Sequence, residues 1–186
     1  AKQDALDRGL GVVRKNYERS TKSGKLTMAD VDKRMAMFDA TLELDKLADC
    51  DLVIEAIFEN MDVKQHTFGK LDKIVKQGAL LATNTSALDI NQIATAVARP
   101  EAVIGLHFFS PANVMRLVEV VRARHTSKPV IATAMQLARD DPELVKTVIA
   151  KLRKSGDIEQ DDLVYLERIA DNWIKVAEHN RQQARR

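Results

Sequence analysis

The chain has 186 residues, with 29 lysines and arginines against 27 aspartates and glutamates and a formal net charge of +2 at pH 7. This length accommodates one well-packed domain, or a domain with a small appendage, and is too short for a two-domain enzyme. Basic residues are scattered along the sequence, which argues against a nucleic-acid partner. No apolar run approaches the ~20 residues that span a bilayer, so we also expect no membrane partner.

The N-terminal part of the chain carries the signals of two helices. Apolar residues recur at helical spacing from Leu6 to Tyr17, and the polar run 22–25 interrupts this pattern. Thr27, three positions before Asp30, predicts the N-cap of a second helix.

Strand and helix patterns alternate in the middle of the chain. We expect strands over residues 51–57 and 80–83, helices over 62–75 and 90–97, and two further strands over 102–106 and 117–121. This alternation is typical of a parallel sheet flanked by helices and wound in the Rossmann manner. The sequence therefore predicts an α/β fold with a Rossmann-like parallel sheet.

Residues 140–186 have a different, helical pattern. An apolar stripe runs from Leu144 to Leu152 behind Pro142, and Asp157 with Gln160 imitates a capping box that opens a second amphipathic helix. We predict a C-terminal helical hairpin. The chain then divides into residues 1–139, a partial Rossmann-like domain, and residues 140–186, a helical tail.

The single cysteine, Cys50, allows neither an internal disulfide nor a cysteine-based metal site. This fits a reducing, cytoplasmic setting. We expect Cys50 to be a small, half-buried residue without a chemical role.

One histidine and one carboxylate fall in neighbouring strands. His107 and Glu119 belong to two apolar runs joined by the turn signal Ser110-Pro111-Ala112-Asn113, so the two side chains could meet across the strand pair. A carboxylate bonded to one ring nitrogen fixes the tautomer of a histidine and makes the other nitrogen a better base. Spacing alone leaves two interpretations, an oriented general base and a strand-end histidine bonded to a nearby carbonyl.

Three segments together resemble the 3-hydroxyacyl-CoA dehydrogenase family, particularly the multifunctional enzymes of fatty-acid β-oxidation. Residues 105–121, Gly-Leu-His-Phe-Phe-Ser-Pro-Ala-Asn-Val-Met-Arg-Leu-Val-Glu-Val-Val, are similar to the catalytic segment of that family. Upstream, Asp-Leu-Val-Ile-Glu-Ala-Ile-Phe-Glu-Asn at 51–60 and Ala-Thr-Asn-Thr-Ser-Ala-Leu at 82–88 are similar to two further signatures, in the right order. The resemblance runs from about Gln3 to about Arg139.

The resemblance implies an NAD-dependent oxidoreductase that converts a 3-hydroxyacyl-CoA to a 3-ketoacyl-CoA. It implies three catalytic residues: His107 as the base, Glu119 as the carboxylate that orients it, and Ser86 as the hydroxyl that bonds the reacting oxygen near the nicotinamide. General-base help of this kind contributes about 10² to 10⁴ in rate.

The resemblance also implies cofactor contacts at the ends of two predicted strands. These fall on Ala56, Glu59, Lys64, Asn84 and Ser86, in line with the rule that open α/β sheets bind ligands beyond the carboxyl ends of their strands. Two plainer interpretations stay open: Glu59 and Lys64 as an exposed pair at helical spacing, and the segment 84–86 as an ordinary strand-to-helix cap.

Two parts of the family pattern have no counterpart in the sequence, the N-terminal Gly-rich motif and the C-terminal helical domain. Family members carry a Gly-rich phosphate-binding turn, whereas the seven glycines here give no G-x-G-x-x-G arrangement. The resemblance therefore implies an incomplete sheet, with an edge that the tail, a second copy or a complementing chain would cover, and a weakened grip on NAD. The alternative is a non-catalytic remnant that acts as a scaffold or oligomerisation module.

Overall fold

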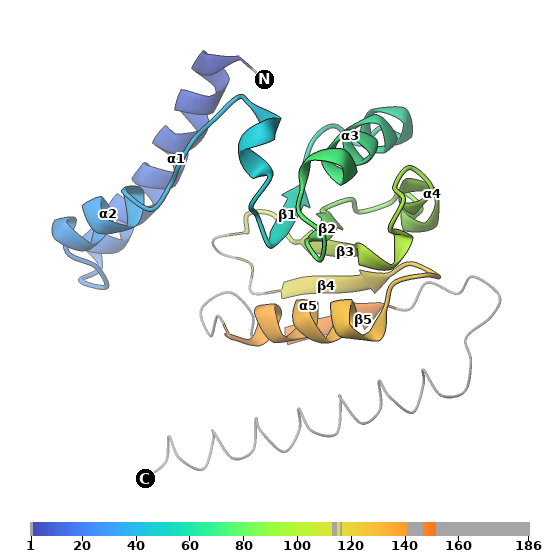
Figure 1. Ribbon diagram of the computed structural model, residues 1–186. Helices are drawn as coiled ribbons and strands as arrows, with labels where there is room; N and C mark the ends of the chain where they lie inside the picture. Colours follow the sequence, from blue (N-terminus) through green and yellow to red (C-terminus); the bar gives the residue numbers. More distant parts are fainter. Residues whose placement is uncertain (1, 113–114, 116, 141–146, 152–186) are drawn as a thin grey trace, which may run out of the picture. The chain divides into compact units, whose positions relative to one another are not determined.

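The computed structural model describes residues 2–112, 115, 117–140 and 147–151 (Figure 1). In chain order the helices are α1 (Gln3–Lys22), α2 (Met28–Met35), α3 (Met61–Ile74), α4 (Ile90–Ala94) and α5 (Lys128–Asp140), with short 3-10 turns η1 (Leu44–Leu47) and η2 (Pro100–Ala102). The strands are β1 (Leu52–Glu55), β2 (Leu80–Thr83), β3 (Val103–Phe108), β4 (Leu117–Arg122) and β5 (Thr147–Lys151).

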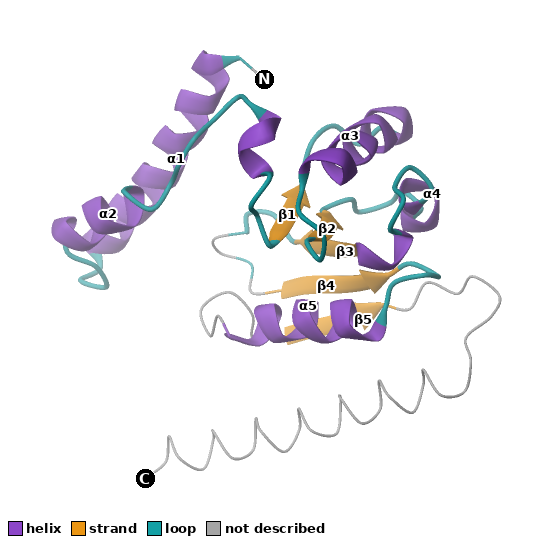
Figure 2. Cartoon of the chain, viewed as in Figure 1, coloured by secondary structure: helices purple, strands orange, loops and turns teal. Residues whose placement is uncertain are grey.

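The strands form one five-stranded sheet in the order β1-β2-β3-β4-β5 (Figure 2). β1, β2 and β3 are parallel to one another, β4 runs antiparallel to β3, and β5 is parallel to β4. The predicted α/β class is confirmed, and the one departure from a fully parallel sheet is the β3–β4 pair. Because β1, β2 and β3 are parallel, their carboxyl ends lie at one edge of the sheet.

The predicted C-terminal hairpin is wrong where the structure describes it. Residues 147–151, expected in its first helix, form β5 and pair with β4. A short apolar run rich in β-branched residues suits a strand as well as a helix, and here pairing with β4 decides the outcome. The rest of the hairpin lies outside the described residues, and the division at residues 139/140 stays a prediction.

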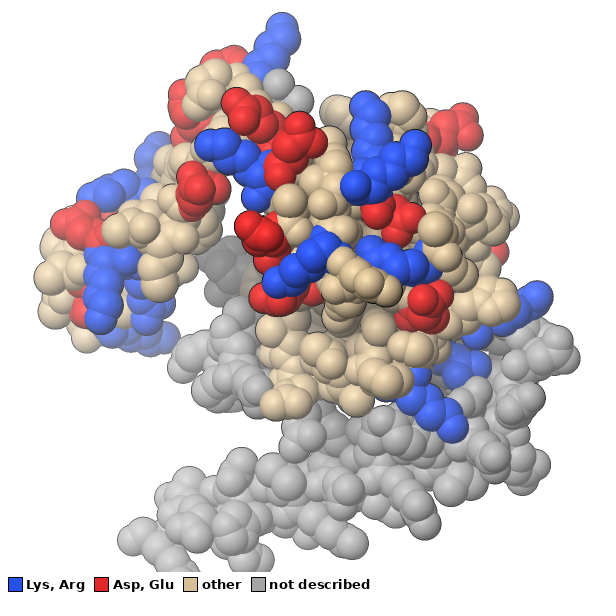
Figure 3. Space-filling view, viewed as in Figure 1, with Lys and Arg blue, Asp and Glu red and all other residues tan. Residues whose placement is uncertain are grey.

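The first two helices pack on each other. Thr27 is the N-cap of α2 as predicted, and with Asp30 it forms a capping box, in which each side chain bonds the backbone N–H of the other residue. Arg14 of α1 reaches Asp32 of α2 at 2.7 Å, and the guanidinium of Arg34 lies 5.4 Å from the centre of the Tyr17 ring. The exposed charges of both signs alternate over the face of the molecule shown in Figure 3.

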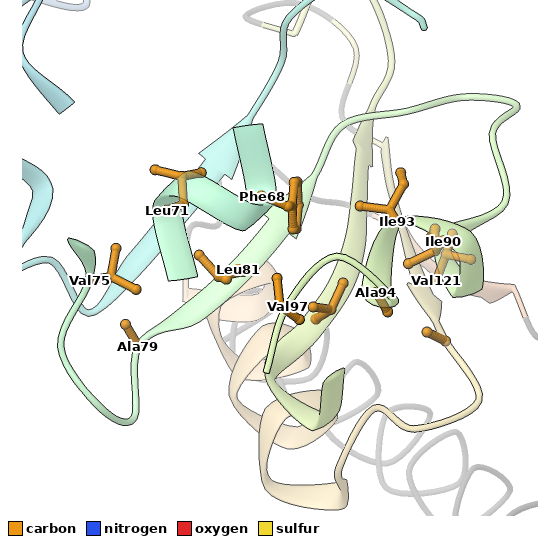
Figure 4. Packing of buried hydrophobic residues seen from close by; sticks show 12 residues of the cluster. Phe68, Leu71, Val75, Ala79, Leu81, Ile90, Ile93, Ala94, Val97 and Val121 are labelled. Atoms are coloured by element: carbon orange, nitrogen blue, oxygen red, sulfur yellow. The ribbon is translucent and has the colours of Figure 1, made fainter. Parts of the chain in front are cut away.

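Two sets of apolar contacts cover the two faces of the sheet. On one face, α3 and α4 pack through Phe68 and Ile93 against the strands (Figure 4). On the other face, Val118 of β4 contacts Ala138 of α5 and the ring of Phe108. Side chains alternate between faces along a strand. His107 and Glu119, one position away from Phe108 and Val118, therefore project on the face that carries α3 and α4.

Gly105 lets α4 approach the sheet closely, two residues before His107. A Cβ at this position would lie 2.9 Å from Cβ of Val121 and would clash with the side chain of Ile90. We expect Gly105→Ala to lower the free energy of unfolding by about 1–3 kcal/mol, the usual cost of overpacking. Urea denaturation measures this. Gly11→Ala on α1, where a Cβ meets nothing within 4 Å, is the matched control and should stabilise the chain by about 0.5–1 kcal/mol. Equal changes in both variants would contradict the prediction.

Candidate active site

His107 and Glu119 face each other across the antiparallel β3–β4 pair. They are direct partners in the strand register, and Nδ1 of His107 lies 2.8 Å from Oε2 of Glu119. The side chain of Glu119 is only 8% exposed and that of His107 is 18% exposed. The predicted meeting of the two side chains is thus found, and it depends on the antiparallel pairing that places them opposite each other.

The contact limits where a proton on the imidazole ring can lie. An ionised carboxylate accepts hydrogen bonds and donates none, so beside an ionised Glu119 it is Nδ1 of His107 that donates, and in the neutral ring the lone pair is then on Nε2. The ring of Phe109 lies 4.8 Å from the histidine ring, centre to centre, and packs against it at a tilt. Together these contacts fix the orientation of the His107 ring.

Asn84 ties the end of β2 to the ends of its two neighbours. Its Oδ1 accepts the backbone N–H of Phe108 at 2.8 Å, next to His107. Its backbone N–H donates to the backbone carbonyl of Glu55 at 2.8 Å. The side-chain oxygen is therefore engaged within the protein. Asn84 holds β3 in place beside the histidine, whatever else it contacts.

Glu59 reaches from the β1–α3 loop to the turn that carries Ser86. Its Oε1 accepts the N–H groups of Ser86 at 3.0 Å and Ala87 at 3.2 Å, together with the hydroxyl of Thr85. Ser86 itself is exposed at this edge of the sheet. Glu59 thus fixes the backbone of the Ser86 turn.

The ionisation of Glu59 reflects these contacts. Burial acts to raise the pKa of Glu59, but the hydrogen bonds from Thr85, Ala87 and Ser86 and the positive charge of Lys64 outweigh it, so the pKa lies below its usual range. A depressed pKa stabilises the fold above the unfolded-state value of about 4.3, and this contribution disappears as the pH falls through the folded-state value.

We therefore expect Glu59→Gln to be less stable than the unchanged chain at pH 7. The difference should shrink as the pH falls below about 4.3, because the carboxyl is protonated first in the unfolded state and, below its depressed pKa, in the folded state as well. Urea unfolding at several pH values measures it. Glu43→Gln, at an exposed position, serves as the control. A stability difference that is the same at pH 7 and at low pH would refute the linkage.

Lys64 is buried, contrary to the interpretation of Glu59 and Lys64 as an exposed pair. Its side chain is 1% exposed, and Nζ contacts the two carboxylate oxygens of Glu55 at 2.7 and 3.0 Å. Oε2 of Glu59 lies farther away, at 3.6 Å. Lys64 is buried because of a contact between distant segments. Glu55 ends β1 with its side chain inside the protein, where Lys64 in the first turn of α3 reaches it.

The predicted site residues thus fall into two groups at the carboxyl edge of β1–β3. His107, Glu119 and Asn84 form one, and Glu59, Ser86 and Lys64 form the other. Ala56 follows β1 and is exposed there. Residue-type patterns missed Glu55 and Thr83. The available signal was a carboxylate at the end of an otherwise apolar strand. A carboxylate is rarely buried unless a partner binds it, so its place in a buried strand predicts such a partner.

The described part of the chain contains no cluster of potential metal ligands. None of the described helices combines the length and apolar character that crossing a bilayer requires.

Polar side chains beyond the carboxyl ends of parallel strands, next to an oriented histidine, lie where open α/β sheets bind their ligands. The chain belongs to the 3-hydroxyacyl-CoA dehydrogenase family: residues 1–152 match the family described as "3-hydroxyacyl-CoA dehydrogenase, NAD binding domain". This confirms the predicted family, an enzyme family whose cofactor is NAD. The match also extends past Arg139, where we expected the resemblance to stop.

Individual relatives agree with this assignment. The chain is 45% identical over 126 residues to a probable 3-hydroxybutyryl-CoA dehydrogenase of Deinococcus radiodurans, covering 68% of this chain and 45% of the relative. It is 55% identical over 93 residues to the peroxisomal bifunctional enzyme of Cavia porcellus, covering 50% of this chain and 13% of the relative. The chain therefore spans less than half the length of either protein.

A solved structure is similar as well. The 3-hydroxybutyryl-CoA dehydrogenase of Escherichia coli K12 superimposes with a TM-score of 0.77 at 33% identity, covering 83% of this chain and 32% of that one. The Rossmann-like fold is thereby confirmed. The roles of the individual site residues stay predictions.

Proposed function

We propose that this chain carries the proton-transfer part of an NAD-dependent 3-hydroxyacyl-CoA dehydrogenase site, acting in fatty-acid β-oxidation. The observation that carries the proposal is the 2.8 Å contact between Nδ1 of His107 and the buried carboxylate of Glu119. Nε2 of His107 takes the proton of the substrate hydroxyl at C3, Glu119 stabilises the imidazolium that forms, and the hydroxyl of Ser86 donates to the reacting oxygen.

The residues present fit part of the cofactor. At the carboxyl edge of β1–β3, Ala56 and Ser86 are exposed, and the carboxylate of Glu59 is 41% exposed and negatively charged, so the edge offers hydroxyl, carboxylate and backbone groups to a nicotinamide nucleotide. When bound, NAD supplies a hydride acceptor. A phosphate cradle needs glycines at a helix N-terminus, whereas Gly9 and Gly11 lie inside α1. Neither of these two glycines therefore forms a phosphate cradle.

The test is an NADH titration of the purified chain followed by fluorescence, with and without acetoacetyl-CoA, and with His107→Ala as the control. The proposal predicts saturable NADH binding, and NADH oxidation that falls by about 10²-fold or more in the variant. A folded chain that binds neither NADH nor acyl-CoA would favour the remnant that serves as a scaffold or oligomerisation module.

Two associated expectations remain proposals. A homo-oligomer or a complementing chain would complete the sheet, and sedimentation of the chain alone and after mixing with such a fragment distinguishes the two.

The cytoplasmic setting is compatible with the sequence, whereas one relative named above is peroxisomal.

A further inference from the structure

Glu55, at the end of β1, is not among the site residues that the sequence predicted, although it binds Lys64. Its side chain is only 1% exposed, although it ends a strand at the edge that carries Ala56, Glu59 and Ser86. We propose that Glu55 is a positioning residue, which sets the Ser86 turn through two hydrogen-bonded routes and thereby shapes the nicotinamide end of the site. The part of the inference that concerns NADH binding rests on the proposed function, and the part that concerns the backbone of the Ser86 turn does not.

Every group around the Glu55 carboxylate is a hydrogen-bond donor. Oε1 accepts the backbone N–H of Ile57 at 2.6 Å and contacts Nζ of Lys64 at 2.7 Å. Oε2 contacts the same Nζ at 3.0 Å and accepts the hydroxyl of Thr83 at 2.7 Å. These donors come from the β1–α3 loop, α3 and β2, so one carboxylate joins three segments at the edge of the site.

The first route to the Ser86 turn runs through Thr83. A hydroxyl has one proton, and Thr83 gives it to Glu55. Its oxygen is then oriented to accept, and it receives the backbone N–H of Thr85 at 3.3 Å. Glu55 therefore determines which way the Thr83 hydroxyl points, and the hydroxyl holds the residue directly before Ser86.

The second route runs through Lys64 and Glu59. Lys64 Nζ, held by Glu55, lies 3.6 Å from Oε2 of Glu59. The other oxygen of Glu59 accepts the N–H of Ser86 at 3.0 Å. Because the buried ammonium attracts one end of the Glu59 carboxylate while the turn binds the other end, the position of Lys64 sets where Glu59 can sit. Both routes start at Glu55 and end on neighbouring residues of one turn.

Glutamine cannot replace Glu55 in this arrangement. A glutamine amide has one acceptor oxygen and one NH₂ group, and in either orientation the NH₂ group would lie against the ammonium of Lys64. One orientation also sets it against the N–H of Ile57, and the other sets it against the Thr83 hydroxyl, which would have to turn and accept instead of donating. Glu55→Gln therefore changes charge and bonding at nearly constant volume.

The decisive measurement uses the backbone amide resonances of Ser86 and Ala87 in the cofactor-free chain, together with the dissociation constant for NADH. We expect Glu55→Gln to displace both resonances and to weaken NADH binding about tenfold, the equivalent of one lost charge-assisted hydrogen bond. The control is Asp72→Asn, which removes the charge from a less buried carboxylate, 3.3 Å from Arg99, at the other end of α3. It should leave both resonances and NADH binding unchanged.

Unmoved Ser86 and Ala87 resonances in Glu55→Gln would overturn the proposal, and so would equal displacement in Asp72→Asn, since that would reflect general loosening. If the unchanged chain does not bind NADH, the proposed function fails for this chain, while the resonances still decide the positioning role.

A double variant keeps the test informative if Glu55→Gln alone does not fold. Glu55→Gln with Lys64→Met removes both buried charges together, which commonly restores stability. We expect this variant to fold and to show displaced Ser86 and Ala87 resonances, because neither route remains. Resonances at their original positions in the folded double variant would overturn the proposal.

Discussion

Replacing Lys64 by methionine should lower the free energy of unfolding by about 3–5 kcal/mol, the cost of removing one partner from a buried ion pair. Methionine fills much of the volume of the lysine stem, so the loss does not come from a cavity. It comes from Glu55, whose carboxylate is 1% exposed and keeps only the Ile57 N–H and the Thr83 hydroxyl as donors. Urea or thermal denaturation at pH 7 measures the change.

The matched control for this prediction is Lys76→Met. Lys76 also contacts a carboxylate at 2.7 Å, that of Asp51, but both side chains are substantially exposed. An exposed pair of this kind contributes about 0–1 kcal/mol, because water solvates both charges. Similar losses in Lys64→Met and Lys76→Met would show that burial of the Glu55–Lys64 pair has no energetic consequence.

Replacing Glu119 by glutamine should lower turnover of acetoacetyl-CoA with NADH by about 10²-fold or more, because the imidazolium loses the charge that stabilises it. An amide can also turn its NH₂ group toward His107, which would favour the proton on Nε2, the nitrogen that has to accept it. NADH oxidation measures turnover. Nitrogen chemical shifts of the ring report the tautomer without any need for activity.

In the unchanged chain we expect the proton on Nδ1 of His107, facing Glu119 at 2.8 Å. In Glu119→Gln we expect a shift toward the other tautomer, and in the control Glu101→Gln, at an exposed position before β3, no change in either measurement. A variant that keeps both the tautomer and the turnover of the unchanged chain would remove Glu119 from the proposed mechanism.

Local patterns located most of the elements around the site. The Thr27–Asp30 cap is found as expected, because a cap depends on residues three positions apart. β2 occupies residues 80–83 as expected, and β1 is shorter than expected, ending at Glu55 instead of residue 57. The backbone N–H of Ile57 turns back to the Glu55 carboxylate and ends the strand. The Glu55 carboxylate that accepts this bond is buried, and a pattern of residue types does not show that burial.

The prediction of a helix at residues 147–151 was wrong for a related reason, because contacts with a distant segment decide the structure there. Helix or strand cannot be chosen from a short apolar run alone, and a strand forms there because β4 presents unpaired backbone groups on the side away from β3. The antiparallel pairing of β3 with β4 follows from the connection between them, which returns the chain after a short loop. Sheet neighbours, not local preference, decide such cases.

The sequence by itself determined the family and the alternating strands and helices, because these depend on residue types at fixed separations along the chain. It left the contact of His107 with Glu119 as one of two interpretations, and the antiparallel pairing of β3 with β4 decided it. Only the tertiary structure decided that Lys64 is buried on Glu55 and that Glu59 binds the Ser86 turn. The physical reason is that burial and hydrogen bonding of a charged side chain depend on which distant segments surround it. For Glu55 those segments are β2, α3 and the β1–α3 loop, and they come together only when the sheet forms.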